Sequence, residues 1–257
     1  FEEVGTQIEK KNVNKKMFIK KFNLDPNKKI AVLFSHIFWD GTFFYGEDLF
    51  IDYEDWFRET LKVMIKKKDV NWIIKVHLAN VVKNKRDIKI NTSEVDILNG
   101  ICKKKPKNII LVDSNDSIST FSYFNFIDYC LTVRGTVGIE AACFGIPVIT
   151  AGTGRYDGNG FTIDHKSKKD YISTIRNIDK IKKYSKQTTN KAILFAYTLF
   201  CKRVFSTQNI KFFFERDQKF SMKANIDSVN VYLENETKLL SEWLISDDED
   251  FINDTFS

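Results

Sequence analysis

Arg134, Gly135 and Thr136 form a turn that leads directly from an apolar run into a helix-forming segment. A glycine in such a turn lets the backbone approach a ligand closely, and the start of the helix offers free N–H groups and a positive partial charge. A phosphate group fits this arrangement, with the Thr136 hydroxyl and the Arg134 guanidinium as further donors. The alternative is that Thr136 only caps the helix.

Glu140 follows one turn into the same segment, among small apolar residues. Its carboxylate could accept hydrogen bonds from vicinal hydroxyl groups, as acidic residues do for the ribose of nucleotides, or could simply face solvent. Lys75 and His77 end another apolar run. Together they would clamp an anion, whereas an isolated histidine at such a position is more often structural.

Most of the 11 glycines lie between residues 133 and 160, and the stretch GTGRYDGNG at 152–160 is too rich in glycine for a helix or strand. This stretch predicts a tight loop that is either a connection or a flap over a ligand. Gly152, Tyr156, Gly158 and Gly160 are therefore candidate ligand-binding residues.

These residues need a scaffold that brings them to one place. Short uninterrupted apolar runs alternate with helix-forming segments, the pattern of a parallel sheet buried on both faces. The fold class is therefore a doubly wound, Rossmann-like α/β fold, which places ligands at the carboxyl ends of the strands. We expect strands at 30–36, 71–77, 108–113, 128–134 and 147–151, and helices at 52–68, 92–104, 117–127, 136–145 and 167–179.

The remaining segments flank this domain. Residues 1–27 are expected to form a polar helix over 1–24 and a linker, 28–180 the sheet domain, and 181–257 a helical C-terminal extension packed on it. Within the extension the sequence predicts helix from about 187 to 245. The chain begins without Met, which suggests a fragment, a processed chain or an excised domain.

Composition narrows the classes of function. The net charge is +6, but the lysines occur in short groups at the ends of expected helices, such as 66–68 and 103–105, so no nucleic-acid partner is predicted. Affinity for an anionic ligand or membrane surface stays open. The 4 cysteines lie far apart without the spacing of zinc ligands, and we expect reduced thiols and no metal site. No apolar run is long enough to span a bilayer.

The stretch RGTVGIEAACFGIPVITAGTGRYDGNGF, together with WIIKVHLAN and LFSHIFWDGTFFYGEDLF, resembles bacterial capsule and surface-polysaccharide biosynthesis proteins. These are glycosyltransferases of the GT-B type, which pair two Rossmann-like domains around a nucleotide-sugar cleft. The resemblance covers about residues 28–175 and is most specific from Thr136 to Gly160. The chain also resembles, more loosely, the C-terminal, donor-binding half of transferases that use CMP-activated acidic sugars such as Kdo or sialic acid.

The resemblance implies roles for single residues. His77 would take the place of a His-Pro pair that contacts the nucleotide, Gly135 and Thr136 would hold its phosphate, and Glu140 would contact the ribose. His77 is followed by Leu78 instead of proline, so CMP-, UDP-, GDP- and dTDP-linked donors all stay open. Since the chain has room for one sheet, the N-terminal Rossmann domain would have been removed, would lie on a partner subunit, or would be absent from a reduced protein.

The sequence therefore predicts the donor-binding part of a metal-independent glycosyltransferase. It would transfer a sugar from a nucleotide-activated donor, with no cofactor besides, to a glycan or lipid-linked acceptor in surface-polysaccharide synthesis. The expected location is the cytoplasm, at the inner face of the membrane, with peripheral membrane association. Two alternatives stay open: a non-catalytic nucleotide- or sugar-binding module that needs a partner, and a nucleotide-sugar epimerase of the same architecture.

The predicted catalytic residues divide into two groups. Lys75, His77 and Arg134 would stabilise the charge that develops on the leaving phosphate. Asp40, in an aromatic loop over 37–52, would serve as general base for the acceptor hydroxyl. Two other carboxylates of that loop, at positions 47 and 48, are weaker candidates for the same role.

Overall fold

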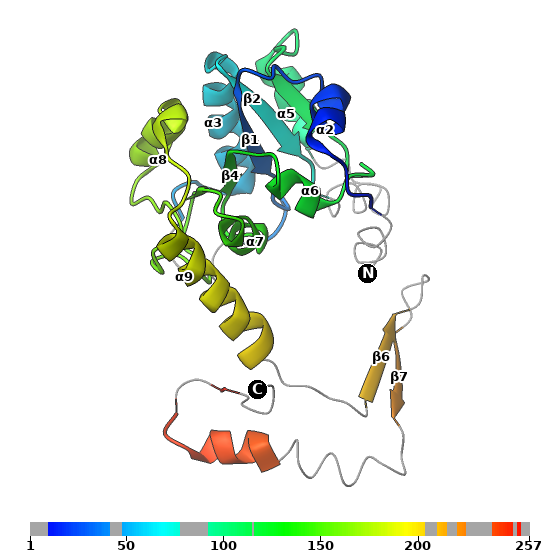
Figure 1. Ribbon diagram of the computed structural model, residues 1–257, viewed down its shortest axis with the longest axis vertical. Coiled ribbons are helices and arrows are strands. Elements are labelled where there is room, and N and C mark those ends of the chain that lie inside the picture. The colour runs from blue at the N-terminus through cyan, green and yellow to red at the C-terminus, as the bar shows by residue number, and fades with distance from the viewer. Residues whose placement is uncertain are drawn as a thin grey trace. The chain divides into compact units, whose positions relative to one another are not determined.

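The computed structural model describes residues 10–41, 48–77, 92–114, 116–203, 210–214, 220–224, 238–248 and 251–252. Contacts between residues divide the chain into two units, one of residues 6–193 and one of residues 1–5 and 194–257. The first unit contains the sheet and all the predicted site residues (Figure 1). The domain limits drawn from the sequence stay predictions.

Five parallel strands form the sheet of the first unit, in the order β3-β2-β1-β4-β5. This Rossmann-like order confirms the predicted α/β class. Each predicted strand is found and ends one or two residues earlier than predicted. The strands are β1 (Lys29–Phe34), β2 (Val70–Lys75), β3 (Ile109–Val112), β4 (Tyr129–Thr132) and β5 (Val148–Thr150).

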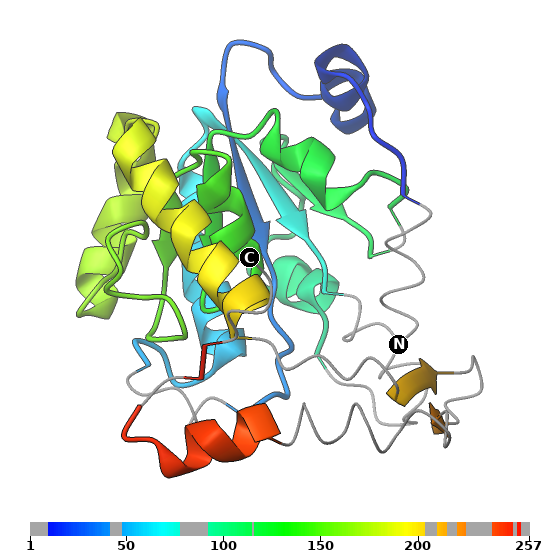
Figure 2. The same ribbon diagram turned by 60° about the horizontal axis from the view of Figure 1, so that its bottom comes forward.

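Helices cover both faces of the sheet (Figures 1 and 2). On one face α3 (Tyr53–Lys66), α5 (Glu94–Ile101) and α8 (Lys168–Arg176) share a hydrophobic core with alternate residues of the strands, such as Trp72 and Leu131. The other face carries α2 (Lys15–Phe22), α6 (Thr120–Phe124) and α7 (Val137–Cys143). There the rings of Phe34 and Phe124 lie 6.3 Å apart and those of Phe18 and Tyr123 lie 5.0 Å apart.

Local signals set the ends of these helices. Asp52, Ser93 and Ser167 precede α3, α5 and α8, and each side chain accepts a hydrogen bond from the backbone N–H three residues on. Gly145 follows α7 with a φ of +74°, a left-handed conformation that glycine adopts without strain. Of the predicted helix over 1–24, residues 1–9 lie outside the described residues. The described helix begins only at Lys15, where Asn14 is the N-cap.

The second unit contains a strand pair that the sequence did not predict. β6 (Ile210–Phe214) and β7 (Phe220–Ala224) pair in antiparallel fashion, so the prediction of helix from about 187 to 245 is wrong at these residues. Isoleucine and consecutive phenylalanines favour extended backbone when a partner strand is present. Helix is found in α9 (Lys186–Tyr197), in a π-helical turn (Thr198–Lys202) and at 238–245.

Candidate functional site

The carboxyl ends of β1 and β4 are the natural place for a ligand in this sheet. The two strands are neighbours, and the chain leaves β1 toward α3 on one face and leaves β4 toward α7 on the other. Folds of this class bind ligands where the connections part in this way. The residues that follow the two strands are His36 and Arg134, and both side chains are engaged within the protein.

His36 ties the end of β1 to the turn after β4. Its Nε2 accepts hydrogen bonds from the backbone N–H groups of residues 133–134, at 3.2 and 3.3 Å, and lies 3.1 Å from the Thr132 hydroxyl. The ring stacks on Tyr53, with centroids 4.6 Å apart. Burial, and then the nearby charges of His77 and Arg134, lower the pKa of His36 to about 3. The imidazole is therefore neutral near pH 7, and its proton lies on Nδ1.

Arg134 is a buried cation whose charge is balanced by Asp48. The side chain of Arg134 is 5% exposed and forms an ion pair with Asp48, whose side chain is 19% exposed. The guanidinium carbon also lies 5.7 Å from the ring centroid of Tyr53. A Cβ at Gly152 would lie 2.8 Å from the guanidinium, so glycine makes room for the arginine there. Arg134 thus joins the segment before α3 to the loop after β5.

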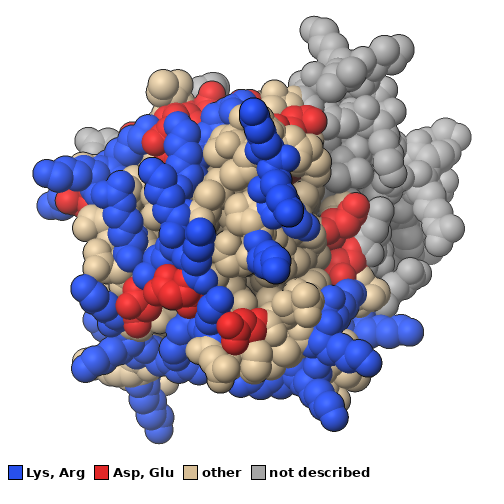
Figure 3. Space-filling view, turned by 90° about the horizontal axis from the view of Figure 1, so that it is seen from above, with Lys and Arg blue, Asp and Glu red and all other residues tan. Residues whose placement is uncertain are grey.

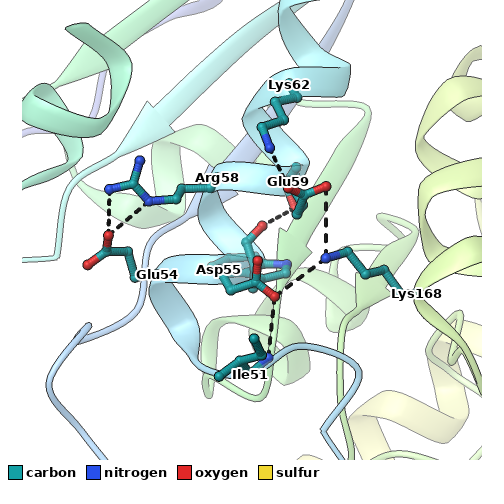
Figure 4. Close-up of polar contacts among 9 residues, drawn as sticks. Ile51, Glu54, Asp55, Arg58, Glu59, Lys62 and Lys168 are labelled. Carbon is teal, nitrogen blue, oxygen red and sulfur yellow. Dashed lines mark hydrogen bonds and ion pairs between the residues drawn. The ribbon is translucent and has the colours of Figure 1, made fainter. Parts of the chain in front are cut away.

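A polar network holds the segment that carries Asp48 onto α3 and α8. Figure 4 shows that Asp55 accepts a hydrogen bond from the Ile51 backbone N–H and pairs with Lys168, at 3.3 and 3.5 Å. On the exposed side of α3, Glu54 pairs with Arg58 and Glu59 pairs with Lys62, both at 2.6 Å. Exposed pairs of this kind contribute at most about 1 kcal/mol each, so the Ile51–Asp55–Lys168 contacts are the ones that hold this segment on α3 and α8.

Lys75 is a nearly buried cation at the carboxyl end of β2. It is 8% exposed, donates to the Thr120 hydroxyl at 3.0 Å, and lies 4.6 Å from the ring centroid of Tyr123. Burial lowers the pKa of Lys75 to about 8, and Lys10 adds to the shift. The attraction of Asp116, and then of Glu140, opposes the shift, which places the lysine and these two carboxylates in one electrostatic environment.

Glu140 is half-buried in α7. Burial raises the pKa of the Glu140 carboxyl, while Lys75 and a hydrogen bond with Thr136 act in the opposite direction. The Glu140 carboxylate therefore lies near the Lys75 cation at the end of β2. Its predicted contact with a ribose stays a prediction.

The turn after β4 presents unused donors. Thr136 is exposed, and its side chain makes a hydrogen bond with Glu140 but none that caps the backbone of α7. Among the described residues, no acceptor is found for the backbone N–H groups of Thr136 and Val137. Gly135 is closely surrounded, since a Cβ there would lie 3.1 Å from the Thr132 hydroxyl oxygen and 3.7 Å from the His36 Nε2. The structure thus leaves the predicted phosphate turn open on its outer side.

The two predicted catalytic residues lie in different surroundings. His77 is half-buried and near enough to His36 for its charge to lower the pKa of that ring. Asp40 is exposed, and its carboxylate accepts from the Gly41 backbone N–H at 3.0 Å, within its own turn. The residue at position 47 lies outside the described residues, and Asp48 is occupied by Arg134. No described contact joins Asp40 to Lys75, Glu140 or Arg134.

The glycine-rich loop after β5 is a fixed element built on buried tyrosine. Tyr156 is 2% exposed, donates to the Gly135 carbonyl at 2.7 Å and lies 6.1 Å from the ring of Phe161. The Gly158 N–H donates to Asp164 at 2.9 Å. Gly158 and Gly160 both have a φ of +74°, the left-handed region that favours glycine. Tyr156 therefore supports the predicted phosphate turn from inside the protein. Its ring is too buried to show the predicted contact with a nucleotide-sugar donor.

Replacing Gly138 with alanine should lower the free energy of unfolding by about 2 kcal/mol, because this site is overpacked by any side chain. A Cβ at Gly138 would lie 2.4 Å from the Tyr156 hydroxyl oxygen and 2.9 Å from its Cζ. Gly100, also helical, has nothing within 4 Å of its Cβ position, so Gly100→Ala is the matched control and should be neutral or stabilising. Urea unfolding measures both, and equal effects at the two sites would contradict the contact.

The sequence placed His36 at the end of a strand but gave it no role, did not single out Tyr53, and treated Asp48 only as a weak candidate for the base. His36 follows an apolar run in the same way as His77, and this placement after a predicted strand could have identified it as a site residue. Nothing local marks Asp48 or Tyr53, because their contacts with Arg134 and His36 join segments far apart in the chain.

No group of three or more His, Cys, Asp or Glu side chains in the described part of the chain is placed to hold a metal ion. Within the same ranges, no helix has the length and apolar character needed to cross a membrane.

No family model matches the sequence, and no curated protein sequence matches it. Solved structures with a distant likeness include KpsC of Thermosulfurimonas dismutans, a beta Kdo 2,4 transferase (TM-score 0.41, 16% identity, 71% of this chain and 47% of that one). UDP-GlcNAc 2-epimerase from Neisseria meningitidis bound to UDP-GlcNAc has a TM-score of 0.41 at 17% identity, over 72% of this chain and 48% of its own. The wall teichoic acid polymerase TagF has a TM-score of 0.41 at 15% identity, over 90% and 48%. The chain thus spans about half the length of these structures, and the likeness is one of fold.

Proposed function

We propose that the carboxyl edge of the sheet binds a nucleotide sugar and that this chain is the donor-binding part of a glycosyltransferase of surface-polysaccharide synthesis. The observation that carries the proposal is Lys75, an almost fully buried cation kept at the ligand-binding end of β2. Burying a charge costs stability, so a lysine retained there is best explained by an anion that it meets. The sequence resemblance over residues 28–175 supports a nucleotide sugar as that anion.

The arrangement suits a leaving nucleotide phosphate. Lys75 would supply positive charge, and the unused N–H groups at the start of α7 would add directed donors to the phosphate oxygens. Glu140 would accept from the ribose hydroxyls, and His77 would contact the nucleotide. Arg134 would act indirectly, by fixing the segment before α3. Gly152, Gly158 and Gly160 would shape the loop beside the donor.

The described residues say less about the acceptor and the general base than about the sugar donor. A glycan or lipid-linked acceptor would approach from the side of a second Rossmann domain or a partner subunit. Because nucleotide sugars are made in the cytoplasm, we place the protein there. Metal-independent transfer fits a site whose positive charge comes from lysine and backbone N–H groups.

One observation favours the second candidate, a binding module without turnover. Asp40, the predicted base, is exposed and hydrogen-bonded within its own turn, and Asp48 is paired with Arg134. Incubating the chain with a nucleotide sugar and a glycan acceptor separates the two functions, since binding without release of nucleotide would leave only the module. Conversion of UDP-GlcNAc without any acceptor would instead indicate an epimerase.

Lys75→Met is expected to abolish nucleotide binding and to stabilise the protein at the same time. The folded-state pKa of Lys75, about 8, lies below the ordinary 10.5, so at pH 7 the buried charge lowers the free energy of unfolding. Removing it should raise that free energy by about 2 kcal/mol, after the loss of the bond to Thr120. Calorimetric titration with CMP, UDP, GDP and dTDP and urea unfolding measure the two effects.

The pH dependence gives a third readout. As the pH rises above about 8, the free protein loses the Lys75 proton, and the affinity of the wild type for a nucleotide should fall by up to about tenfold per pH unit. Lys75→Met should lack this dependence. Glu140→Ala and His77→Ala should weaken binding, and the exposed control Lys169→Met should not. If no nucleotide binds the wild type, or if Lys75→Met binds like the wild type, the donor site is misplaced.

A further inference from the structure

Exposed lysines crowd the opposite end of the sheet, where the loops lead into the amino ends of the strands. Figure 3 looks onto this end and shows many Lys and Arg side chains spread across it, with several smaller groups of Asp and Glu among them. We call the exposed lysines of three loops here the amino-edge lysine face. They are Lys66 and Lys68 before β2, Lys103, Lys104, Lys105 and Lys107 before β3, and Lys180, Lys182 and Lys183 after α8.

Hydrogen bonds and ion pairs fix these loops beside one another. The Asn108 side chain donates to the Lys67 carbonyl at 3.1 Å, and Lys67 pairs with Asp179 at 2.6 Å. The Tyr129 hydroxyl, at the start of β4, donates to the Ile181 carbonyl at 3.2 Å. The three lysine groups therefore form one surface whose loops are held in place from below.

Within the described part of the chain, carboxylates do little to balance the charge of this face. Among the described residues, none of its nine lysines forms an ion pair with a carboxylate. The acidic residues of this edge are engaged by other lysines: Asp69 and Asp179 by Lys67, Asp25 by Lys28, and Asp128 by Lys29. An open groove of about 1340 Å³ runs along the loop before β3 and is lined by several of the same lysines.

We infer that the amino-edge lysine face docks the protein on an anionic phospholipid bilayer. The charges are spread over several loops at one end of the domain, so many can approach a planar anionic surface together. Lysine acts as a mobile point charge, suited to a diffuse field and not to reading base edges. None of the exposed large apolar or aromatic side chains of the described residues lies in these loops, so nothing there is placed to stack on bases or to enter the hydrocarbon.

The orientation has a consequence for the proposed donor site. β1 is 6 residues long, which separates the two edges of the sheet by about 20 Å of strand. Docking at the amino edge would turn the carboxyl edge away from the bilayer, so an acceptor would reach it from the aqueous side. The docking itself does not depend on the donor site and can hold or fail separately.

Sedimentation with vesicles tests the docking. The full chain should bind vesicles of phosphatidylcholine with phosphatidylglycerol, should not bind pure phosphatidylcholine, and should be released by salt. The variant K103E/K104E/K105E/K107E should lose about 600-fold in partition, since each of the four lysines contributes about fivefold near an anionic surface. The control K11E/K166E/K169E/K191E changes the net charge equally at exposed lysines toward the other edge, and should keep most of the binding.

Three results would overturn the inference. The wild type could fail to bind anionic vesicles, or the two quadruple variants could lose binding equally, which would make net charge the only cause. Duplex DNA could also displace the protein from vesicles at the same salt and bind more tightly, which would make the face a nucleic-acid surface. Circular dichroism and melting temperatures of both variants ensure that the comparison is between folded proteins.

Discussion

Asp48→Asn is expected to lower the free energy of unfolding by about 4 kcal/mol. The substitution keeps the size of the side chain and removes only the charge that balances Arg134, which is 5% exposed. A buried guanidinium without a counterion costs far more than a surface ion pair contributes. The pair also joins the segment before α3 to the turn after β4, so its loss should loosen the edge that carries the proposed donor site.

Urea unfolding of four variants measures this effect and its cause. Asp69→Asn removes an exposed partner of Lys67 and should cost less than about 1 kcal/mol. The double variant Asp48→Asn/Arg134→Met should be more stable than Asp48→Asn alone, because replacing both members of a buried pair leaves no lone charge. If Asp48→Asn costs no more than Asp69→Asn, the ion pair does not hold this edge together.

The strands and helix ends of the first unit were predictable because local residues determine them. Each strand is a short apolar run buried on both faces, and β1 and β2 are almost entirely buried. The Ser167 side chain caps α8 and Gly145 ends α7, both as expected from residue type. Because the strands are parallel, their carboxyl ends lie at one edge, as predicted, whereas the order β3-β2-β1-β4-β5 was not part of the prediction.

The side-chain contacts of the site were not predictable in the same way. Arg134 was expected to face a phosphate, but its charge is balanced by Asp48, which lies 86 residues away in the chain. Tyr156 was expected to contact a ligand, but it is buried under the turn it supports. The strands β6 and β7 depend on pairing with each other, and pairing across a turn is invisible to helical periodicity. Tertiary contacts decide all three cases.

Acidification should destabilise the protein through His36, by about 2.5 kcal/mol between pH 7 and pH 4.5. The folded-state pKa of His36, about 3, lies below the ordinary 6.5, so between these values the unfolded chain binds a proton that the native state does not. Stability is therefore fully present above pH 6.5 and is lost as the pH falls toward 3. A protonated Nε2 would lose both backbone donors and would face the positive charges of Arg134 and His77.

The difference between wild type and His36→Gln isolates this effect. A glutamine oxygen can accept from the same backbone N–H groups and does not titrate, so the stability advantage of the wild type should shrink steadily below pH 6.5. Burial also lowers the pKa of His165, and this contribution cancels in the comparison because both proteins retain that residue. His165→Gln is the matched control. If the unfolding free energies of wild type and His36→Gln run parallel from pH 7 to 4.5, then His36 is not held neutral by the turn after β4.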